Sequence, residues 1–285
     1  MKTYVITGAS DGIGAELARQ IAAAKQGNAA LVLAARNRDK LQEVAAQCEA
    51  AGADALAVTT DVTQEAQCRA LVAAAVARFG GLNCLVNNAG MSAHALLEDV
   101  AAADLGWYQD LMAVNLWGSV WCTHAALPHL KASRGQIVAV SSLAGLVGVP
   151  GRTAYSATKF AMTGFFEALR AELKPAGVAV TLAYPGVVDT AIRLRGYDAR
   201  GRPAGRSGLK EEGAMPVDQC ARLILQGMQA RRREVVMTTR GKLGRFLKLV
   251  APGVVENIAL AALKDDVRPG AAAAGKAGPL PGQGG

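Results

Sequence analysis

The feature that most constrains the fold is a glycine-rich turn between a short strand pattern and a helical pattern at the start of the chain. Thr3 to Ile6 is β-rich, the turn runs Thr7-Gly8-Ala-Ser-Asp-Gly12-Ile-Gly14, and helical periodicity begins at Ala15. In such a unit the first glycine permits the tight turn, the second lets the backbone approach a phosphate, and the third lets helix and strand pack closely. The helix N-terminus attracts anions. The stretch predicts a pyrophosphate cradle for a dinucleotide, and the alternative is a tight loop alone.

The second strand pattern bears on which dinucleotide is bound. Residues 30–35 read Ala-Leu-Val-Leu-Ala-Ala, and Arg36-Asn-Arg38 follows. NAD-binding folds place an Asp or Glu near this strand end, where it bonds the ribose 2′-hydroxyl. Here alanine and then Arg36 occupy the position, and a guanidinium pairs bidentately with a 2′-phosphate. We therefore favour NADP over NAD, although Asp11 is a counter-signal and Arg36 and Arg38 could be solvated loop residues.

Two later strand patterns end in polar residues. Residues 55–60 lead to Asp61, which could accept a hydrogen bond from an adenine amino group or cap a helix that starts near Thr63. Residues 82–86 run into Asn87-Asn88-Ala89-Gly90. The two amides can tie neighbouring strand ends together, and Ala89-Gly90 lets a cofactor lie close. An Asn-rich turn is the alternative for this piece.

A long helix is predicted from Asp104 to Leu130, and Asn115 lies in an apolar stretch of it. A buried amide needs hydrogen-bond partners, and Asn can also bend a helix and hold a water in a proton relay. Taken alone, the residue is better interpreted as a satisfied core asparagine. The fifth strand pattern, residues 136–140, leads into Ser141-Ser142, where a serine hydroxyl could bond a substrate oxygen.

Tyr155-Ser-Ala-Thr-Lys159 stands at the start of a helical pattern from Ala154 to Leu173. Residues four apart lie on one helix face, so the Lys159 ammonium lies on the same side as the Tyr155 phenol. A nearby cation stabilises the phenolate and lowers the phenol's pKa from its reference of about 10. A tyrosine tuned in this way can give a proton to a carbonyl or take one from an alcohol. The alternative is a surface pair on an amphipathic helix.

The bulk properties exclude several classes of protein. The 285 residues allow one large α/β domain or two small ones. No apolar run reaches the roughly 20 residues of a membrane span, and because residues 1–7 form a strand pattern we expect no signal peptide. The five cysteines lack Cys-x-x-Cys spacing, so we expect no metal site and reduced thiols in a cytoplasmic protein.

The charge is unevenly distributed along the chain. Residues 1–190 carry 14 basic and 15 acidic residues, whereas residues 191–285 carry 17 and 8. The net charges of −1 and +9 argue against a nucleic-acid-coating surface. They indicate an anionic partner near the C-terminal segment.

Together these residues resemble the short-chain dehydrogenase/reductase family over about residues 3–190. The resemblance rests on short motifs in one order and spacing: Thr7-Gly8-x-x-x-Gly12-x-Gly14, Asp61, Asn87-Asn88-Ala89-Gly90, Asn115, Ser142, Tyr155-x-x-x-Lys159 and Pro185-Gly186-Val-Val-Asp-Thr190. It implies an α/β, Rossmann-like, doubly wound parallel sheet of about seven strands with helices on both faces. Residues 141–173 are further similar to hydroxysteroid dehydrogenases and lipid-linked ketone reductases, which implies an apolar ketone or secondary alcohol.

The resemblance also implies residue roles. Tyr155 would be the general acid/base, Ser142 (with Ser141 as second choice) would polarise the carbonyl, Lys159 would bond the nicotinamide ribose, and Asn115 would hold the relay water. Thr190 would contact the nicotinamide carboxamide. The predicted NADP(H) contacts are Gly8, Ser10, Asp11, Gly12, Ile13, Gly14, Arg36, Arg38, Asp61, Val62, Asn88, Ala89, Gly90, Tyr155, Lys159, Pro185, Gly186, Val188 and Thr190. A homodimer or homotetramer is implied, paired through the helices that bear Asn115 and Tyr155.

The last third is predicted to supply specificity. Residues 191–213, rich in Gly and Arg, are interpreted as a mobile substrate lid, followed by a helix over 216–230 and a strand over 234–237. A basic helical extension over 239–264 would complete a single domain of residues 1–268, and the tail 269–285 is predicted to be disordered.

Within this extension, one helix face is apolar and the other basic. Leu243, Phe246, Leu247 and Val250 share a face, and Lys242, Arg245 and Lys248 lie on the other side. We prefer packing of the apolar face on the core or on a partner subunit. Peripheral contact with an anionic membrane, at the inner membrane surface, is the alternative.

These observations favour an NADP(H)-dependent oxidoreductase that transfers hydride between the nicotinamide and a small-molecule ketone or secondary alcohol, with no nucleic-acid partner. A non-catalytic NADP-binding regulator on the same fold is the main alternative. A serine hydrolase that uses Ser142 with His124 or His129 is disfavoured, because no Gly-x-Ser-x-Gly elbow surrounds Ser142.

Overall fold

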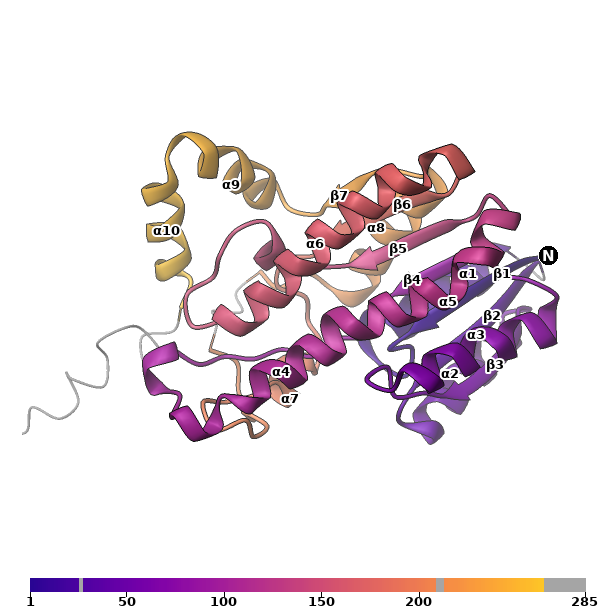
Figure 1. The fold of residues 1–285 in the computed structure, drawn as a ribbon, viewed down its shortest axis with the longest axis horizontal. Coiled ribbons are helices and arrows are strands. Elements are labelled where there is room, and N and C mark those ends of the chain that lie inside the picture. The colour runs from indigo at the N-terminus through magenta and orange to yellow at the C-terminus, as the bar shows by residue number, and fades with distance from the viewer. Residues whose placement is uncertain (26–27, 209–212, 264–285) are drawn as a thin grey trace, which may run out of the picture.

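A seven-stranded parallel sheet forms the centre of the molecule (Figure 1). The computed structural model describes residues 1–25, 28–208 and 213–263. The strands are β1 (Lys2–Thr7), β2 (Ala29–Ala35), β3 (Asp54–Thr59), β4 (Cys84–Asn87), β5 (Gln136–Val140), β6 (Ala179–Tyr184) and β7 (Glu234–Val236). Their order is β3-β2-β1-β4-β5-β6-β7, with parallel pairing throughout. The strand order reverses between β1 and β4, which is where open α/β sheets bind their ligands.

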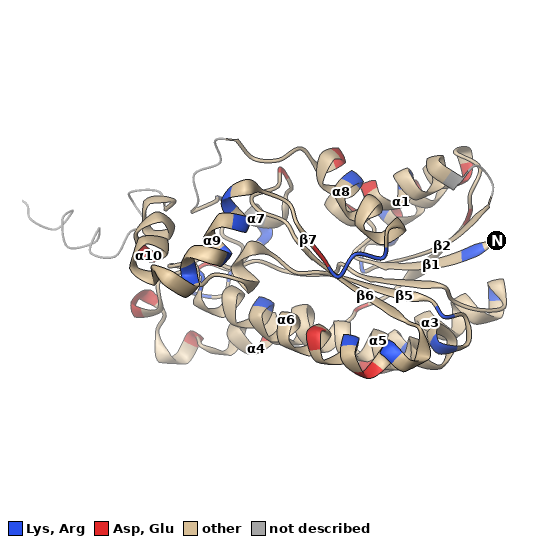
Figure 2. Ribbon diagram, turned by 90° about the horizontal axis from the view of Figure 1, so that it is seen from above, with Lys and Arg blue, Asp and Glu red and all other residues tan. Residues whose placement is uncertain are grey.

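Helices cover both faces of the sheet, as the sequence predicts (Figure 2). One face carries α1 (Gly12–Lys25), α2 (Arg38–Ala50) and α8 (Val217–Gln229), whose apolar side chains form one core with the sheet. The other face carries α3 (Glu65–Phe79), α5 (Gly118–Ala132) and α6 (Thr153–Leu173), which form a second core. Because both faces are covered, the central strands are nearly continuous runs of buried apolar residues.

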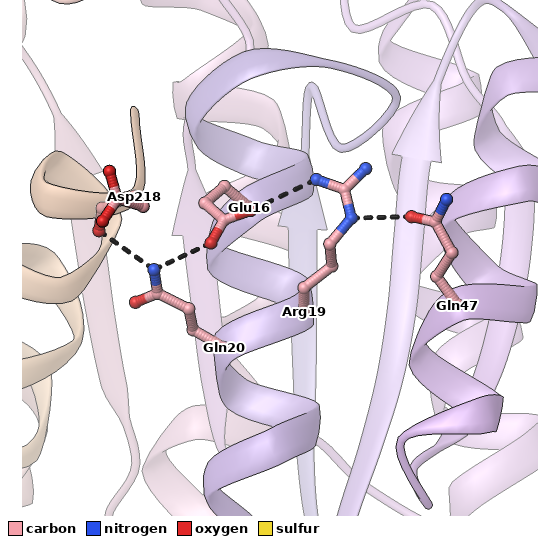
Figure 3. A network of polar contacts seen from close by, with 5 residues as sticks. All are labelled: Glu16, Arg19, Gln20, Gln47 and Asp218. Atoms are coloured by element: carbon pink, nitrogen blue, oxygen red, sulfur yellow. Dashed lines mark hydrogen bonds and ion pairs between the residues drawn. The ribbon is translucent and has the colours of Figure 1, made fainter. Parts of the chain in front are cut away.

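Polar contacts hold α1 between its two neighbouring helices (Figure 3). The Arg19 Nε donates to the Gln47 Oε1 of α2 at 2.6 Å, and the Gln20 Nε2 donates to the Asp218 carbonyl oxygen of α8 at 2.9 Å. Glu16 accepts from both Arg19 and Gln20. These contacts orient α1, whose N-terminus at Gly12 faces the ligand-binding edge of the sheet.

The helix predicted from Asp104 to Leu130 is interrupted. It comprises α4 (Gly106–Met112), a π-helical turn over Ala113–Trp117, and α5, which extends to Ala132. Asn115 lies inside the π turn. Turns of this kind are rare and often mark functional sites, because the extra residue re-aims a side chain.

The short helix α7 (Ile192–Arg195) lies in the region predicted to be a lid, of which residues 209–212 lie outside the described residues.

The C-terminal part of the described chain forms two further helices outside the sheet layers, α9 (Thr239–Val250) and α10 (Pro252–Ala261). Helix α9 contains the predicted basic segment and packs against β7 and α10. The predicted disordered tail, 269–285, also lies outside the described residues.

The preferred interpretation of the apolar face of α9 needs a correction. Leu243, Phe246 and Val250 are exposed and Leu247 is half-buried. The described part of the chain therefore does not pack this face on its own core. The reason is that the opposite side of α9 holds the helix on the protein, through contacts that the helical pattern alone does not reveal.

The remaining bulk expectations concern cysteines and membrane spans. All five cysteines are buried free thiols. Burial raises the pKa of the Cys48 thiol to about 11. Among residues 1–25, 28–208 and 213–263 there is no cluster of metal-ligating side chains. No helix in that part of the chain has the length and apolar character needed to cross a bilayer.

Candidate active site

A cavity of about 590 Å³ opens at the carboxyl edge of the sheet, around the reversal between β1 and β4. Most of the predicted site residues line it. These are Gly8, Ser10, Asp11, Gly12, Ile13, Arg36, Asp61, Val62, Asn88, Ala89, Gly90, Ser142, Tyr155, Lys159, Pro185, Gly186, Val188 and Thr190. Gly14, Arg38 and Asn115 do not line the cavity. The fold therefore gathers residues from seven separated segments at one place.

The glycine-rich turn has the backbone geometry that its sequence predicts. Gly8 has φ +66° and Gly12 has φ +54°, conformations that side-chain-bearing residues rarely adopt. A Cβ on Gly14 would lie 2.5 Å from the Asn88 Nδ2 and closer still to the Gly8 carbonyl oxygen. Gly14 is thus required for close packing inside the turn rather than for contact with the cavity.

The two adjacent asparagines have different partners, which corrects part of the prediction. The Asn88 Nδ2 donates to the Thr7 carbonyl oxygen at 3.0 Å, and the Thr7 Oγ1 accepts from the Asn88 and Ala89 amides at 3.0 Å. Asn88 therefore ties the end of β4 to the end of β1, as expected. The Asn87 Nδ2 instead donates to Thr123 Oγ1 of α5 at 2.9 Å, so it anchors a helix and not a strand end.

Asp61 does not cap the helix that follows it. Its Oδ1 accepts from the Thr63 amide at 2.9 Å and from the Thr63 hydroxyl at 2.8 Å, which makes a local turn. Helix α3 begins two residues later, with Gln64 in the capping position. The carboxylate faces the cavity, which is the position required for contact with an adenine.

The region after β2 separates the two candidate arginines. Arg36 lines the cavity, whereas Arg38 is the first residue of α2 and is exposed outside it. Asn37 lies between them and caps α2 by accepting from the Lys40 amide at 3.0 Å. Of the two predicted arginine contacts, only Arg36 therefore lies at the cavity.

The Asp11 carboxylate, which argues against phosphate binding in the sequence, is paired. Its Oδ2 lies 2.6 Å from the Arg195 Nη2 of α7. The ion pair neutralises the acid and joins the segment after β6 to the glycine-rich turn. Sequence spacing gives no sign of this pair, because the partners are 184 positions apart.

Tyr155 and Lys159 are both almost completely buried on α6. The Lys159 Nζ lies 5.7 Å from the centre of the Tyr155 ring and donates to the Val140 carbonyl oxygen at 3.0 Å. Burial raises the pKa of Tyr155, but the charges of Lys159 and Arg152, with hydrogen bonds from Ser142 and Arg152, outweigh it, so the net pKa is lowered. Burial, aided by the Arg152 charge, lowers the pKa of Lys159.

Ser142 and Ser141 differ in what their hydroxyls bond. The Ser142 hydroxyl is close enough to the Tyr155 phenol to help lower its pKa, and the Ser142 Oγ accepts from the Ala144 amide at 3.2 Å. The Ser141 hydroxyl donates to the Lys159 carbonyl oxygen at 3.2 Å. Ser142 is therefore the serine that faces Tyr155, as the spacing favours, and Ser141 is held by backbone.

Arg152 is a site residue that the sequence reasoning missed. Its guanidinium carbon lies 4.1 Å from the centre of the Tyr155 ring, and it lines the cavity. Its Nη2 donates to the Ser92 Oγ at 2.5 Å and its Nε to the Ala93 carbonyl oxygen at 3.3 Å. These bonds hold a second cation over the phenol. Arg152 precedes the first residue of α6 and has a non-helical backbone, so helical spacing does not predict its contact with Tyr155.

Asn115 lies behind the cavity wall and is completely buried. Its Oδ1 accepts from the Met91 amide at 2.7 Å. Its Nδ2 donates to the Met91 carbonyl oxygen at 3.0 Å and to the Thr158 Oγ1 at 2.9 Å. Both amide hydrogens are used, so only acceptor capacity remains to hold a water. The side chain ties the π turn to the loop after β4 and to α6.

Apolar side chains form a large part of the cavity wall. They include Met91, Leu143, Val149, Val187 and Ile192. Two further residues that were not predicted also line the cavity. They are Ala259 in α10 and Ala262, the residue that caps the C-terminus of this helix. His124 and His129 lie on α5 and neither lines the cavity, so no histidine pairs with Ser142 there as a hydrolase requires.

Comparison with known proteins agrees with this geometry. A family model described as short chain dehydrogenase matches residues 2–199. The 11-beta-hydroxysteroid dehydrogenase-like 4A of Arabidopsis thaliana is 42% identical over 189 residues, which are 66% of this chain and 61% of that protein. The chain thus spans about three fifths of that relative's length. The 11-beta-hydroxysteroid dehydrogenase A of Sesamum indicum is 36% identical over 261 residues, or 90% of this chain and 73% of that protein.

Two solved structures have the same fold. A short chain dehydrogenase/reductase from Burkholderia phymatum in complex with NAD has a TM-score of 0.76 and 28% identity, and covers 89% of this chain and 94% of its own. An alcohol dehydrogenase from Thermococcus sibiricus, complexed with 5-hydroxy-NADP, has a TM-score of 0.70 and 26% identity, and covers 83% and 94%.

Proposed function

Because the chain belongs to the short-chain dehydrogenase family, we propose that it is an NADP(H)-dependent oxidoreductase that interconverts an apolar ketone and its secondary alcohol. One observation carries the proposal. A buried tyrosine with a lowered pKa stands between two cations, in the same cavity as a glycine-rich turn at a helix N-terminus. This combination holds a dinucleotide and moves a proton at one atom of a substrate.

The glycine-rich turn fits a dinucleotide. The positive φ of Gly8 and Gly12 leaves the backbone open at the N-terminus of α1, where the helix dipole favours a pyrophosphate. Gly90 lies on the other side of the cavity, where a Cβ would come 3.1 Å from the Asn115 Oδ1 and 3.7 Å from the Lys159 Nζ. When bound, the nicotinamide supplies or accepts the hydride.

The protein's own contribution is to position the carbonyl and move one proton. Ser142 donates a hydrogen bond to the substrate oxygen and orients it beside Tyr155. The Tyr155 phenol gives its proton to that oxygen in reduction, and the phenolate takes it back in oxidation. Lys159 and Arg152 stabilise the phenolate, so the pKa of Tyr155 is lowered and the phenol gives up its proton more readily.

The preference for NADP is supported by Arg36. It is the first side chain after β2 to line the cavity, and no carboxylate stands at the end of that strand. A guanidinium there attracts the 2′-phosphate of NADP. NAD usually bonds its ribose 2′-hydroxyl to a carboxylate at this position, and this protein has none there. The Asp11 carboxylate does not count against NADP, because Arg195 neutralises its charge.

The proposed substrate is apolar because the wall of the cavity that holds Tyr155 includes Met91, Leu143, Val149, Val187 and Ile192. The relatives from Arabidopsis thaliana and Sesamum indicum are named for hydroxysteroids, which are apolar secondary alcohols. Both observations favour a lipid- or steroid-like ketone over a small polar one.

A homo-oligomer is part of the proposal and is supported by exposed aromatic residues. Trp117, at the end of the π turn, is 49% exposed and stacks on Trp121 of α5 with ring centres 6.0 Å apart. Phe160 on α6 is also exposed. Large aromatic side chains of this kind are enriched in subunit interfaces.

The function is tested with purified protein, NADPH or NADH, and a panel of ketones that runs from small polar to steroid-like. We expect oxidation of NADPH with the apolar ketones, and slower turnover with NADH. Cofactor binding without turnover of any ketone would contradict the proposed activity and favour a regulatory role.

A further inference from the structure

Helices α9 and α10 expose a concentrated apolar surface next to the substrate part of the cavity. Seven of the thirteen large apolar side chains that are exposed in the described residues lie between positions 243 and 260. We call them the apolar C-terminal surface: Leu243, Phe246, Leu249, Val250, Val254, Ile258 and Leu260. Phe246 is 62% exposed and Leu249 is 80% exposed. Single exposed apolar residues are ordinary, whereas a contiguous group marks an interaction site.

The side of α9 that faces the protein carries Gly241, Gly244 and Leu247, its least exposed residues, and two basic side chains reach the protein beside them. Arg245 pairs with Glu234 at the start of β7, and the Lys248 Nζ donates to the Leu146 carbonyl oxygen at 3.0 Å. Gly241 on the same side is buried. A surface helix normally buries its apolar side and turns its charges outward. In α9, by contrast, Leu243, Phe246 and Val250 are not covered by the described residues.

The outward side of α9 has cations along both margins. At about 100° per residue, Leu243, Phe246 and Val250 fall within an arc of roughly 60°, with Arg240 and Lys242 on either side of it. Leu249 lies just beyond Lys242, outside this arc. Both cations are exposed, and neither forms an ion pair with another described residue. Helix α9 contains no acidic residue. An apolar stripe between two cations is complementary to a surface whose outer layer is anionic and whose inner layer is apolar.

We propose that the apolar C-terminal surface docks the protein on an anionic phospholipid bilayer. Phe246 and its neighbours would lie at the boundary of head groups and acyl chains, with Arg240 and Lys242 at the phosphates. Figure 1 shows α9 and α10 projecting from the end of the sheet, which leaves them room to meet a flat surface. A second copy of this chain is a poorer occupant, because a two-fold interface brings like cationic margins together.

Docking would also bring the substrate cavity to the lipid. Helix α10 turns Ala259 into the cavity, while its Val254 and Ile258 belong to the apolar C-terminal surface. One short helix thus separates the two. Entry of an apolar ketone from the bilayer is the part of this inference that rests on the proposed function; the docking does not depend on it.

The test is co-sedimentation of the full chain with vesicles of phosphatidylcholine alone and of phosphatidylcholine mixed with phosphatidylglycerol. We expect binding to the mixed vesicles that weakens as salt is added. Phe246→Ser/Val250→Ser and Arg240→Glu/Lys242→Glu should each lower partitioning at least about tenfold. The matched controls Leu97→Ser/Leu105→Ser and Lys131→Glu/Lys174→Glu change the same residue classes elsewhere and should bind within about twofold of the parent.

The docking proposal is overturned if the parent does not sediment with mixed vesicles at low salt, or if variants and controls lose binding equally. It is also overturned if the protein does not bind vesicles and Phe246→Ser/Val250→Ser lowers its oligomeric mass, because the surface would then be a subunit interface. A fluorescence titration with NADPH verifies that every variant is folded. Vesicle binding without ketone reduction supports docking and counts against the enzyme proposal alone, so the two failures are distinguishable.

Discussion

The Arg195 Nη2 lies 2.6 Å from the Asp11 Oδ2 and joins α7 to the glycine-rich turn. The two side chains are 59% and 32% exposed, so the pair contributes little to the free energy of unfolding. Its importance is local, because both residues line the cavity where a pyrophosphate would lie. Arg195 neutralises a carboxylate that would otherwise repel the ligand.

Arg195→Ala should therefore weaken binding of NADPH and of NADH alike, by about fivefold, since one uncompensated charge near the surface costs about 1 kcal/mol. Adding Asp11→Asn should restore most of the affinity. Nicotinamide fluorescence titrations measure both effects. A loss confined to NADPH would mean instead that Arg195 serves the 2′-phosphate.

Arg36 and Arg38 form a matched pair for the cofactor preference, because only Arg36 lines the cavity. Arg36→Ala should weaken NADPH binding by about tenfold to a hundredfold, the value of a charge-assisted hydrogen bond, and leave NADH nearly unchanged. Arg38→Ala should change neither. If both substitutions weaken NADPH binding equally, Arg36 has no specific contact with the 2′-phosphate, and the total positive charge of this region explains the preference.

Tyr155→Phe removes the proposed proton donor and keeps the ring. We expect kcat/KM for ketone reduction to fall about a hundredfold to ten-thousandfold while NADPH binding persists. Tyr108→Phe is the control, since its hydroxyl bonds Thr153 outside the cavity at 2.8 Å. Steady-state kinetics on the best ketone decide the matter, and a variant at position 155 with parental activity would remove Tyr155 from the mechanism.

Arg152→Met tests the second cation through the pH dependence. Lys159, Arg152 and the Ser142 hydroxyl act on the buried phenol, and together they lower the pKa of Tyr155. Oxidation needs the phenolate, so its rate rises with pH through that pKa; reduction needs the phenol, so its rate falls. Without the guanidinium the pKa rises, and both limbs should move to higher pH.

Arg152→Lys keeps the charge and should leave the limbs close to their original positions. A purely structural role, through the bonds to Ser92 and Ala93, predicts lower rates in both variants with unchanged pH limbs. The pH profiles of kcat/KM in the two directions separate these cases.

Two glycines in helices should respond oppositely to alanine. A Cβ on Gly14 meets Gly8 and Asn88, so Gly14→Ala should destabilise the protein by about 1–3 kcal/mol through overpacking. Gly164 of α6 has nothing within 4 Å of its Cβ position, so Gly164→Ala should stabilise the protein by about 0.5–1 kcal/mol. Thermal unfolding followed by circular dichroism reports both signs; a tolerated Gly14→Ala would show that the turn can relax.

The sheet and the two core faces could be predicted from the sequence because strand patterns, turn glycines and helix periodicity agree at each step. The cavity was also predictable, since residues at the carboxyl ends of parallel strands converge. Gly8, Asp61, Asn88 and Ser142 reach the cavity for that reason, whereas Tyr155 reaches it from α6.

The rest depends on contacts between distant segments. The Arg195–Asp11 pair, the guanidinium over Tyr155 and the Ala259 wall require the path of the last third of the chain, which no local pattern encodes. The apolar face of α9 was visible in the sequence, but which face is buried was decided by Arg245, Lys248 and their partners. Periodicity identifies two faces and does not orient them.

The Asn88 and Ala89 amides donate hydrogen bonds to the Thr7 Oγ1, and these bonds have a consequence for folding during synthesis. The partners are more than 80 positions apart, and β1 pairs with β4 as well as with β2. During synthesis the glycine-rich turn therefore cannot close until β4 has emerged from the ribosome. Until then β1 presents an unpaired edge, the state in which nascent parallel sheets are exposed to aggregation.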